Sequence, residues 1–246
     1  MNFFSLFKRK LIYSLKKKYS IDKDDFQKKN LDFLFHHYGS DKANIFKKTN
    51  KSGHGFSHFY EKKFQDWKKK ELNILEIGSY AGASAAAFIK YFEKAKVFCL
   101  DINISNFKYS SSKIEVFGVD IKNRKKVINI FKKIFIQNNF EKFDVIIDDG
   151  SHQLSDILYS LNFYFRYLKK DGIFVIEDYK HPNYYDYNCD VNDIFVDKLI
   201  EHLKNKQLFK SSFFDEEDQL YMFNTISKIE TFKGNLEDSN ICFIKK

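Results

Sequence analysis

The feature that most constrains the fold is a change of sequence pattern near Leu72. From there on, short apolar runs alternate with helical segments, which is typical of a parallel sheet built from βαβ units. We expect five parallel strands at 73–77, 96–101, 114–119, 143–147 and 173–176. We expect helices at 83–92, 125–135, 154–168 and 192–204, and a closing pair of strands within 220–232 and 241–245. The sequence therefore predicts a doubly wound α/β fold with seven strands.

Residues 1–71 lack this alternation, and we expect them to form a helical arm and an active-site lid ahead of a domain at 72–246. A second helix is expected at 20–35, with Ser20 or Asp22 near its start as a cap, followed by a loop at 38–58.

The first helix is expected at 2–18 because four apolar residues recur there at helical spacing among basic residues: Phe4, Phe7, Leu11 and Leu15. Such a helix can touch a membrane surface. A narrow apolar stripe favours packing on its own domain or on a second subunit instead. We therefore expect a homo-oligomer without stable membrane insertion.

Composition and charge narrow the class of protein. A hydrophobic content of 43% in 246 residues allows a large core and excludes wholesale disorder. The net charge of +9 is compatible with a nucleic-acid partner, but much of the excess lies in 8–18 and in scattered lysines, so no nucleic-acid partner is expected. The three cysteines form no C-x-x-C pair, which argues against a zinc site or a disulfide framework. With no apolar run long enough for a membrane span, a cytoplasmic location fits best.

A run of small residues follows the first expected strand, in the sequence Glu76-Ile77-Gly78-Ser79-Tyr80-Ala81-Gly82-Ala83-Ser84. Small residues let a ligand approach the backbone there. Tyr80 occupies the place of the second glycine of the dinucleotide fingerprint, so the spacing favours S-adenosylmethionine (SAM) over NAD. Asp101 ends the second strand, where an acid can accept the ribose hydroxyls. Asp120 ends the third and either accepts from the adenine amine or caps a helix.

We expect the following cofactor-binding residues: Glu76, Gly78, Ser79, Tyr80, Gly82, Ser84, Asp101, Asp120 and Asp148.

Pairs of acids end the fourth and fifth strands, in Asp148-Asp149-Gly150-Ser151-His152 and in Glu177-Asp178. Neighbouring parallel strands bring these carboxylates to one sheet edge, where a hard cation such as Mg²⁺ would offset their repulsion. The alternative is that Asp148 or Asp149 caps the helix near Gln153 while Glu177 and Asp178 are solvated. With a metal beside it, His152 can act as the base that removes a hydroxyl proton during attack on the SAM methyl group.

These motifs resemble the class I SAM-dependent methyltransferases over about 72–246. The D-D-G-S-H and I-E-D segments are similar to those of metal-dependent sugar O-methyltransferases, the mycinamicin and demethylmacrocin O-methyltransferases, and of the related cephalosporin-hydroxylase-like group. The resemblance implies a Rossmann-like methyltransferase sheet, Mg²⁺ bound by Asp149, Glu177 and Asp178, and His152 as the base. Asp149 then has a catalytic role as well.

The resemblance extends to the lid, through Tyr38-Gly39-Ser40-Asp41-Lys42, His54 and Phe59-Tyr60-Glu61. Ser40 and Phe56 stand where that family has Thr and Tyr. The resemblance implies substrate or lid roles for four residues: Asp41, Lys42, His54 and Tyr60.

The function expected is SAM- and Mg²⁺-dependent methylation of a sugar hydroxyl. The Phe- and Lys-rich, Pro-poor composition points to an AT-rich coding sequence, which suggests a nucleotide-activated sugar for capsule or other surface polysaccharide rather than a macrolide. One alternative is an RNA methyltransferase, favoured by the charge; it would lack an N-P-P-Y motif because Pro182 is the only proline. Others are a non-catalytic SAM- or sugar-binding protein and, disfavoured by Tyr80, an NAD-dependent dehydrogenase.

Overall fold

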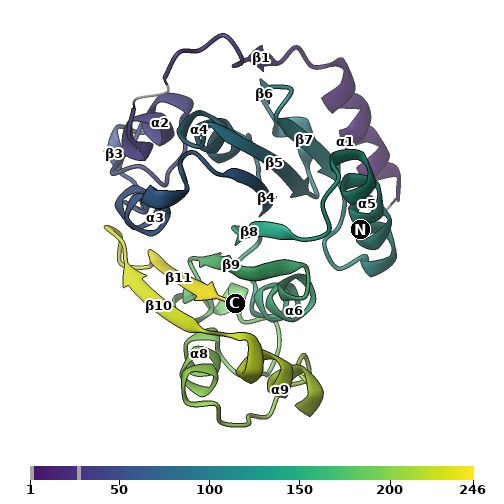
Figure 1. Cartoon of the computed structure of the whole chain (residues 1–246), viewed down its shortest axis with the longest axis vertical. Coiled ribbons are helices and arrows are strands. Elements are labelled where there is room, and N and C mark those ends of the chain that lie inside the picture. Colours follow the sequence, from purple (N-terminus) through teal and green to yellow (C-terminus); the bar gives the residue numbers. More distant parts are fainter. Residues whose placement is uncertain (1–2, 27–28) are drawn as a thin grey trace. The chain divides into compact units, whose positions relative to one another are not determined.

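The computed structural model describes residues 3–26 and 29–246, with the side chains of residues 3 and 4 excepted. Contacts divide the chain into two compact units, Met1–Phe140 and Glu141–Lys246 (Figure 1). This division falls at a different place from the one expected between 1–71 and 72–246, which stays a prediction.

The first unit is built on three parallel strands in the order β4-β5-β7. They are β4 (Glu71–Ile77), β5 (Lys94–Asp101) and β7 (Ile114–Gly118), with α4 (Ala83–Tyr91) after β4 and α5 (Arg124–Asn138) after β7. The start of α4 is rich in alanine, and its residues 83–89 are buried. The expected strands and helices of this region are confirmed to within a few residues.

The N-terminal segment of the first unit differs from expectation. The described residues at 20–26 and 29–35 do not form a single helix: β1 (Tyr19–Ser20) pairs in parallel with β6 (Tyr109–Ser110), and α2 (Leu31–Tyr38) begins after Asn30. The Asn30 side chain accepts from Phe33 N at 2.9 Å and so caps α2. Asp22 instead accepts from Ser111 Oγ at 2.5 Å. The acid that was expected to start a helix thus ties the segment to another loop.

The expected loop at 38–58 contains short elements. They are the hairpin β2 (Ile45–Phe46) and β3 (Lys51–Ser52), followed by α3 (Ser57–Phe64) and the 3-10 turn η1 (Gln65–Trp67). The helices α2, α3 and α4 meet in an aromatic cluster, in which the Phe88 ring lies 5.4 Å from the rings of both Phe35 and Tyr60.

Helix α1 (Phe3–Leu15) packs on the 3-10 turn η2 (Ile104–Asn106) through polar and aromatic groups. Arg9 donates to Ile102 O at 3.0 Å, and Lys16 Nζ donates to Ser105 O at 3.0 Å. The Tyr13 and Phe107 rings make an edge contact at 6.3 Å. The arm thus packs on its own unit, as expected.

The apolar stripe of α1 does not make this contact. Phe7, Leu11 and Leu15 are 62%, 49% and 77% exposed, and the side chain of Phe4 lies outside the part described. These three residues therefore do not pack on their own unit, and packing of the stripe on a second subunit stays a prediction.

The second unit has four strands in the order β10-β11-β9-β8. Strands β8 (Phe143–Asp148) and β9 (Leu168–Glu177) are parallel, whereas β11 (Asn240–Lys245) is antiparallel to both β9 and β10 (Lys228–Lys233). The helices are α6 (Leu154–Phe165), α7 (His181–Tyr184), α8 (Val196–Asn205) and α9 (Glu216–Thr225), with the 3-10 turn η3 (Asp186–Asn188). Residues 220–225, expected within a strand, belong to α9, because a capping box of Asp215 and Asp218 starts a helix there.

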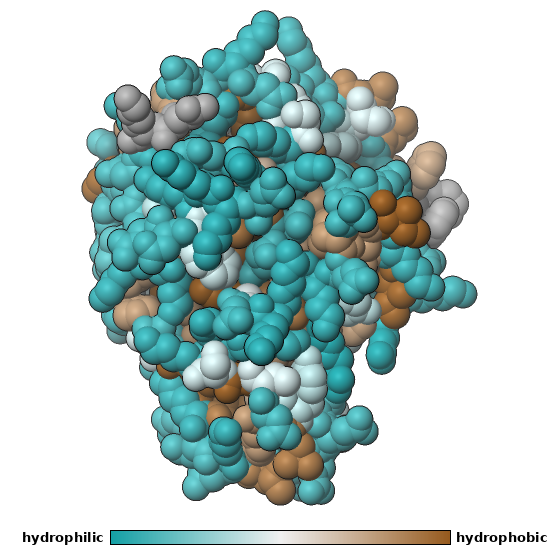
Figure 2. All heavy atoms as spheres, in the orientation of Figure 1, coloured by the Kyte–Doolittle hydropathy of each residue, from teal (hydrophilic) through white to brown (hydrophobic). Residues whose placement is uncertain are grey.

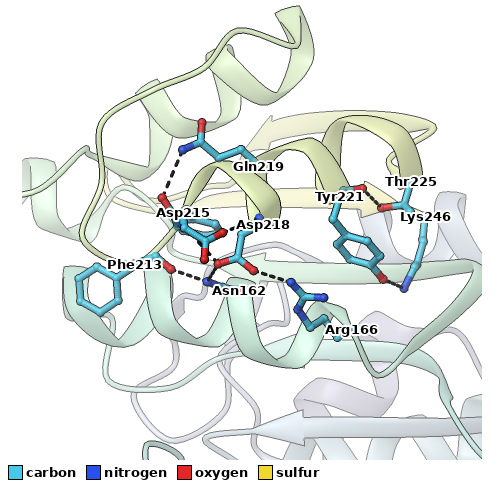
Figure 3. A network of polar contacts seen from close by, with 10 residues as sticks. Asn162, Arg166, Phe213, Asp215, Asp218, Gln219, Tyr221, Thr225 and Lys246 are labelled. Carbon is cyan, nitrogen blue, oxygen red and sulfur yellow. Dashed lines mark hydrogen bonds and ion pairs between the residues drawn. The ribbon is translucent and has the colours of Figure 1, made fainter.

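A polar network fixes α9 against α6 (Figure 3). Asn162 Nδ2 donates to Asp218 Oδ2 at 2.8 Å, and Arg166 donates to the other oxygen of the same carboxylate. Lys246 Nζ, at the end of β11, donates to Tyr221 OH at 2.6 Å. Partial burial acts to raise the pKa of Asp218, but the hydrogen bonds from Arg166 and Asn162 outweigh it and lower that pKa below its ordinary value.

The three strands of the first unit and the four of the second confirm the expected mixed, mostly parallel α/β fold with seven strands. Cys99 and Cys242 are buried and Cys189 is half-buried, and none of the three forms a disulfide. Within 3–26 and 29–246, no helix combines the length and the apolar character needed to cross a membrane.

Candidate active site

The turn between β4 and α4 is built from residues in left-handed backbone conformations. Gly78 and Gly82 have φ values of +83° and +76°, and Tyr80 between them has φ +41°. A Cβ on Gly82 would overlap the ring of Phe107, so the turn is closed on one side by packing and only glycine fits there.

Buried polar groups support this turn from below. Glu76 is fully buried and accepts a hydrogen bond from Ser84 Oγ, which lies in the first turn of α4. Ser79 Oγ donates to the carbonyl of Glu76 at 3.3 Å. Burial and the nearby Glu76 raise the pKa of the Cys99 thiol, which stays protonated beneath the turn. The cofactor residues expected within 76–84 therefore lie together on this turn, and Glu76 and Ser84 are joined by a hydrogen bond.

Asp101 is placed at the end of β5, facing the same turn. Its Oδ2 accepts from Tyr80 N at 2.7 Å, and its Oδ1 accepts from Asn103 N at 2.5 Å. The carboxylate thus orients the turn, and each oxygen keeps a second lone pair for a ligand hydroxyl.

Asp120 follows β7 and is half-buried, with Oδ1 accepting from Lys122 N at 3.0 Å. It does not cap α5: the cap is Asn123, which accepts from Lys126 N at 3.1 Å. The alternative role of Asp120 as that helix cap is therefore wrong, and its contact with adenine stays a prediction.

The expected lid residues divide into two groups. Asp41, Lys42 and His54 lie in loops joined by backbone hydrogen bonds, of which His54 N to Asp41 O measures 2.7 Å. Lys42 is buried, whereas Asp41 is exposed. Tyr60 is fully buried in the aromatic cluster of α2, α3 and α4, a position that favours a packing role.

The acids of the second unit lie where β8 and β9 end. These strands are paired with Asp148 opposite Ile176, so Asp149 and Asp178 come directly after neighbouring strand ends. Ligand atoms of Asp149, His152 and Asp178 lie within 4.8 Å of one another. Glu177 is buried beside Asp178 but lies outside this group. We refer to Asp149, His152 and Asp178 as the acidic triad.

The alternative structural roles for these acids are wrong. Helix α6 has Gln153 at its N-cap and no side-chain cap there, so neither Asp148 nor Asp149 caps it. Glu177 and Asp178 are buried rather than solvated, with exposed fractions of 2% and 4%. Burial raises the pKa of Asp148 to about 7.

His152 is held at the edge of the acidic triad by backbone and ring contacts. Its Nε2 lies 3.7 Å from Asp149 Oδ1, and its carbonyl accepts from Asn188 Nδ2 at 3.0 Å. Its φ is +57° and that of Asp178 is +50°, so both residues adopt the left-handed region that favours glycine.

A second histidine, His181, contacts the ring of His152, and the sequence did not indicate it. The rings of His181 and His152 lie 4.7 Å apart, and His181 Nε2 is 3.6 Å from Asp238 Oδ2. Tyr185 OH donates to the same Asp238 oxygen at 2.6 Å, and this bond raises the pKa of Tyr185 to about 12. His181 therefore lies between the His152 ring and Asp238, in contact with both.

The two carboxylates of the acidic triad offer the hard oxygen ligands that Mg²⁺ prefers. The imidazole of His152 beside them is a side chain that can act as a general base. The turn of the first unit offers glycines, which keep side chains out of the way of a ligand, and an acid suited to a ribose. The sequence therefore identified most of the residues that gather at these strand ends. The exceptions are His181 and Asp238, whose separation in sequence carries no motif.

Comparison with known proteins agrees with this geometry. Residues 75–179 match a family described as a methyltransferase domain. The chain is 25% identical over 132 residues to mycinamicin VI 2''-O-methyltransferase of Micromonospora griseorubida, covering 51% of this chain and 31% of that protein. It is 30% identical over 135 residues to L-olivosyl-oleandolide 3-O-methyltransferase of Streptomyces antibioticus, covering 51% and 32%. The matches thus span about a third of these curated relatives.

Among solved structures, the MycE methyltransferase of the mycinamycin biosynthetic pathway, in complex with Mg, SAH and mycinamycin VI, superposes with a TM-score of 0.67. The superposition covers 89% of this chain and 55% of that one at 20% identity, which establishes a shared fold. Residues 75–179 therefore match a methyltransferase domain family, and the chain shares the fold of the MycE methyltransferase.

Proposed function

We propose that this protein transfers the methyl group of SAM to a sugar hydroxyl, with Mg²⁺ at the acidic triad and His152 as the base. The observation that carries the proposal is the gathering of Asp149, His152 and Asp178 within 4.8 Å at the ends of two parallel strands. Two carboxylates beside an imidazole suit metal-assisted removal of a proton from an alcohol.

The first unit would hold the cofactor. The glycines at 78 and 82 carry no side chains that would obstruct the cofactor, and Asp101 would accept from the ribose hydroxyls. Bound SAM would supply an electrophilic methyl group. The contacts expected from Tyr80 and Asp120 belong to the same proposal. Asp148, at the end of β8 in the second unit, stays an expected cofactor contact.

The second unit would hold the metal through Asp149 and Asp178, with buried Glu177 as the third expected ligand. Bound Mg²⁺ would supply positive charge that makes an acceptor hydroxyl more acidic. His152 removes the hydroxyl proton, and the Asp149 carboxylate 3.7 Å away stabilises the imidazolium that results. His181 restricts rotation of the His152 ring.

For the acceptor, we propose a nucleotide-activated sugar destined for a surface polysaccharide. Support for a sugar comes from the relatives, whose names include an olivosyl-oleandolide methyltransferase. Support for the nucleotide-linked form is the AT-rich type of composition, which is unusual for macrolide producers. Asp41, Lys42 and His54 are the proposed lid residues on the acceptor side.

The test is transfer of an isotope-labelled methyl group from SAM, followed by mass spectrometry, with nucleotide sugars, free glycosides and RNA as parallel acceptors. We expect a labelled nucleotide sugar, and loss of the product in EDTA that Mg²⁺ restores. Labelling of RNA alone, or turnover at the full rate in metal-free protein, would contradict the proposal. Methylation only of a lipid- or polymer-linked glycan would retain the chemistry and reject the nucleotide-linked acceptor.

A further inference from the structure

Helix α1 has two faces with opposite roles. Arg9, Tyr13 and Lys16 dock the helix onto η2, through hydrogen bonds to Ile102 O and Ser105 O and a ring contact. Phe7, Leu11 and Leu15 follow one another at four-residue spacing and therefore share a single face. That face points away from the docked one, since these three side chains are between half and three-quarters exposed. We call Phe7, Leu11 and Leu15 the outer stripe.

The charges around the outer stripe are all of one sign. Residues 3–18 contain six basic residues and no acid, in the sequence FFSLFKRKLIYSLKKK. At 3.6 residues per turn, Lys8 and Lys10 lie on either side of the stripe, and both are exposed. In the view of Figure 2, apolar surface gathers among hydrophilic surface at the upper right, where α1 lies in Figure 1.

We propose that the outer stripe binds an anionic phospholipid surface, with Phe7, Leu11 and Leu15 entering the headgroup–acyl boundary and Lys8 and Lys10 at the level of the lipid phosphates. Apolar residues flanked by lysines are the arrangement by which a helix lies in the plane of a membrane interface. The docked face keeps α1 formed before it meets the membrane, so the ordering of the helix does not oppose binding.

A second copy of the chain fits the outer stripe less well. Two copies of α1 would bring lysines of the same sign together with no acid on either helix to offset them. A stable protein interface buries about 800 Å² on each partner. Three partly covered side chains, at no more than roughly 250 Å² each even for large aromatics, do not reach that area.

The experiment is flotation of the full chain with phosphatidylcholine vesicles, with and without about 30% phosphatidylglycerol, in low salt. We expect binding only to the anionic vesicles. Lys8→Gln with Lys10→Gln should weaken binding about 25-fold, or about fivefold for each lysine. Leu11→Gln with Leu15→Gln should weaken it at least about tenfold, because the apolar contribution is lost.

Ile136→Gln is the matched control, because Ile136 is 81% exposed on α5 of the same unit and outside the outer stripe. This variant should bind anionic vesicles as the parent does, and circular dichroism should show all the variants folded. Absence of binding to anionic vesicles, equal binding to both vesicle types, or an equal loss with Ile136→Gln would overturn the proposal. So would a lipid-free dimer in sedimentation velocity that Leu11→Gln with Leu15→Gln dissociates.

Discussion

Three of the residues proposed to act on ligands, Tyr80, His152 and Asp178, have left-handed backbone conformations. Side chains other than glycine adopt this region at a cost of about 1–3 kcal/mol each, which the surrounding fold must offset. Each of the three follows a strand by one to four residues. The strained turns place these side chains beyond the sheet edge, where ligands bind in folds of this class.

Single substitutions should separate the two roles proposed within the acidic triad, proton removal by His152 and Mg²⁺ binding by Asp149. His152→Ala should lower kcat by roughly 10²–10⁴ because it removes the base, while Mg²⁺ affinity measured by calorimetry stays near that of the parent. Asp149→Asn should lose Mg²⁺ affinity, because a carboxylate ligand is replaced by a neutral amide. Loss of metal binding in both variants would instead make His152 a ligand.

Asp101 should contribute to cofactor affinity. Asp101→Ala should weaken binding of S-adenosylhomocysteine, measured by calorimetry, by about 1.5–3 kcal/mol, the value of a charge-assisted hydrogen bond. Glu93→Ala is the control, because Glu93 is an exposed acid just before β5, at the end of the strand opposite Asp101. Unchanged affinity in a folded Asp101→Ala protein would refute the ribose assignment.

The sequence predicted the residues of the strand ends because each acid follows an apolar run within a recognisable motif. It could not predict His181 and Asp238, because their pairing depends on how the loop before β11 reaches α7. Tyr60 shows the opposite difficulty, since its motif suggested a lid role and its surroundings are aromatic core.

At the scale of secondary-structure elements, the glycine that begins α4 should be intolerant of a side chain. Gly82→Ala should lower the free energy of unfolding in urea by about 1–3 kcal/mol, from its φ of +76° and from overlap with the Phe107 ring. Gly39→Ala is the control for backbone strain alone, because Gly39 has φ +80° and open space around its Cβ position. Equal effects of the two substitutions would mean that Phe107 moves aside at no cost.

The contribution of the contact between α9 and α6 to the free energy of unfolding should decrease at low pH. The folded-state pKa of Asp218 lies below its ordinary value of 3.8, so the contribution of this carboxylate to stability is present above that value. The contribution is lost as pH falls through the lower, folded-state pKa.

The difference in unfolding free energy between the parent and Asp218→Asn should therefore be steady from about pH 5 to 7 and shrink below about pH 4. Glu216→Gln removes an exposed acid from the same turn and serves as the control. A difference that does not change below pH 4 would show that the Asp218 charge is not what Arg166 recognises.

Elements with strong hydrophobic periodicity were predicted well. Elements decided by particular side-chain hydrogen bonds were not. Four of the five parallel strands, β4, β5, β8 and β9, each bury a mostly apolar run that the sequence displays directly, and β7 is half-buried. The segment at 20–35 has helix-forming residues, but the tie of Asp22 to Ser111 links positions far apart in the sequence. Residues 220–225 resemble a strand, and the capping box at Asp215 decides for a helix.

At the scale of the whole molecule, cofactor binding should appear as thermal stability. S-adenosylhomocysteine at about 100 times its Kd should add about 2.7 kcal/mol, which for a chain of this size raises Tm by roughly 5–10 °C. NAD at the same concentration should leave Tm unchanged, because Tyr80 occupies the place of the second fingerprint glycine. A shift with NAD alone would favour a dehydrogenase.

The division of the chain at Phe140 was not visible in the sequence. Asn139, with φ +54°, ends α5 with its amide donating to Phe135 O, and β8 begins at Phe143. No run of glycine, proline or serine marks this short connection. Only the distribution of contacts along the chain separates the units.

The distribution of thiols makes the second unit accessible to spectroscopy without engineering. Of the three cysteines only Cys189 is partly accessible, while Cys99 and Cys242 are buried in strands. Cys189 directly follows Asn188, whose side chain holds the carbonyl of His152. A maleimide fluorophore should therefore label the native protein at a single position, and its emission would report occupancy of the acidic triad in real time.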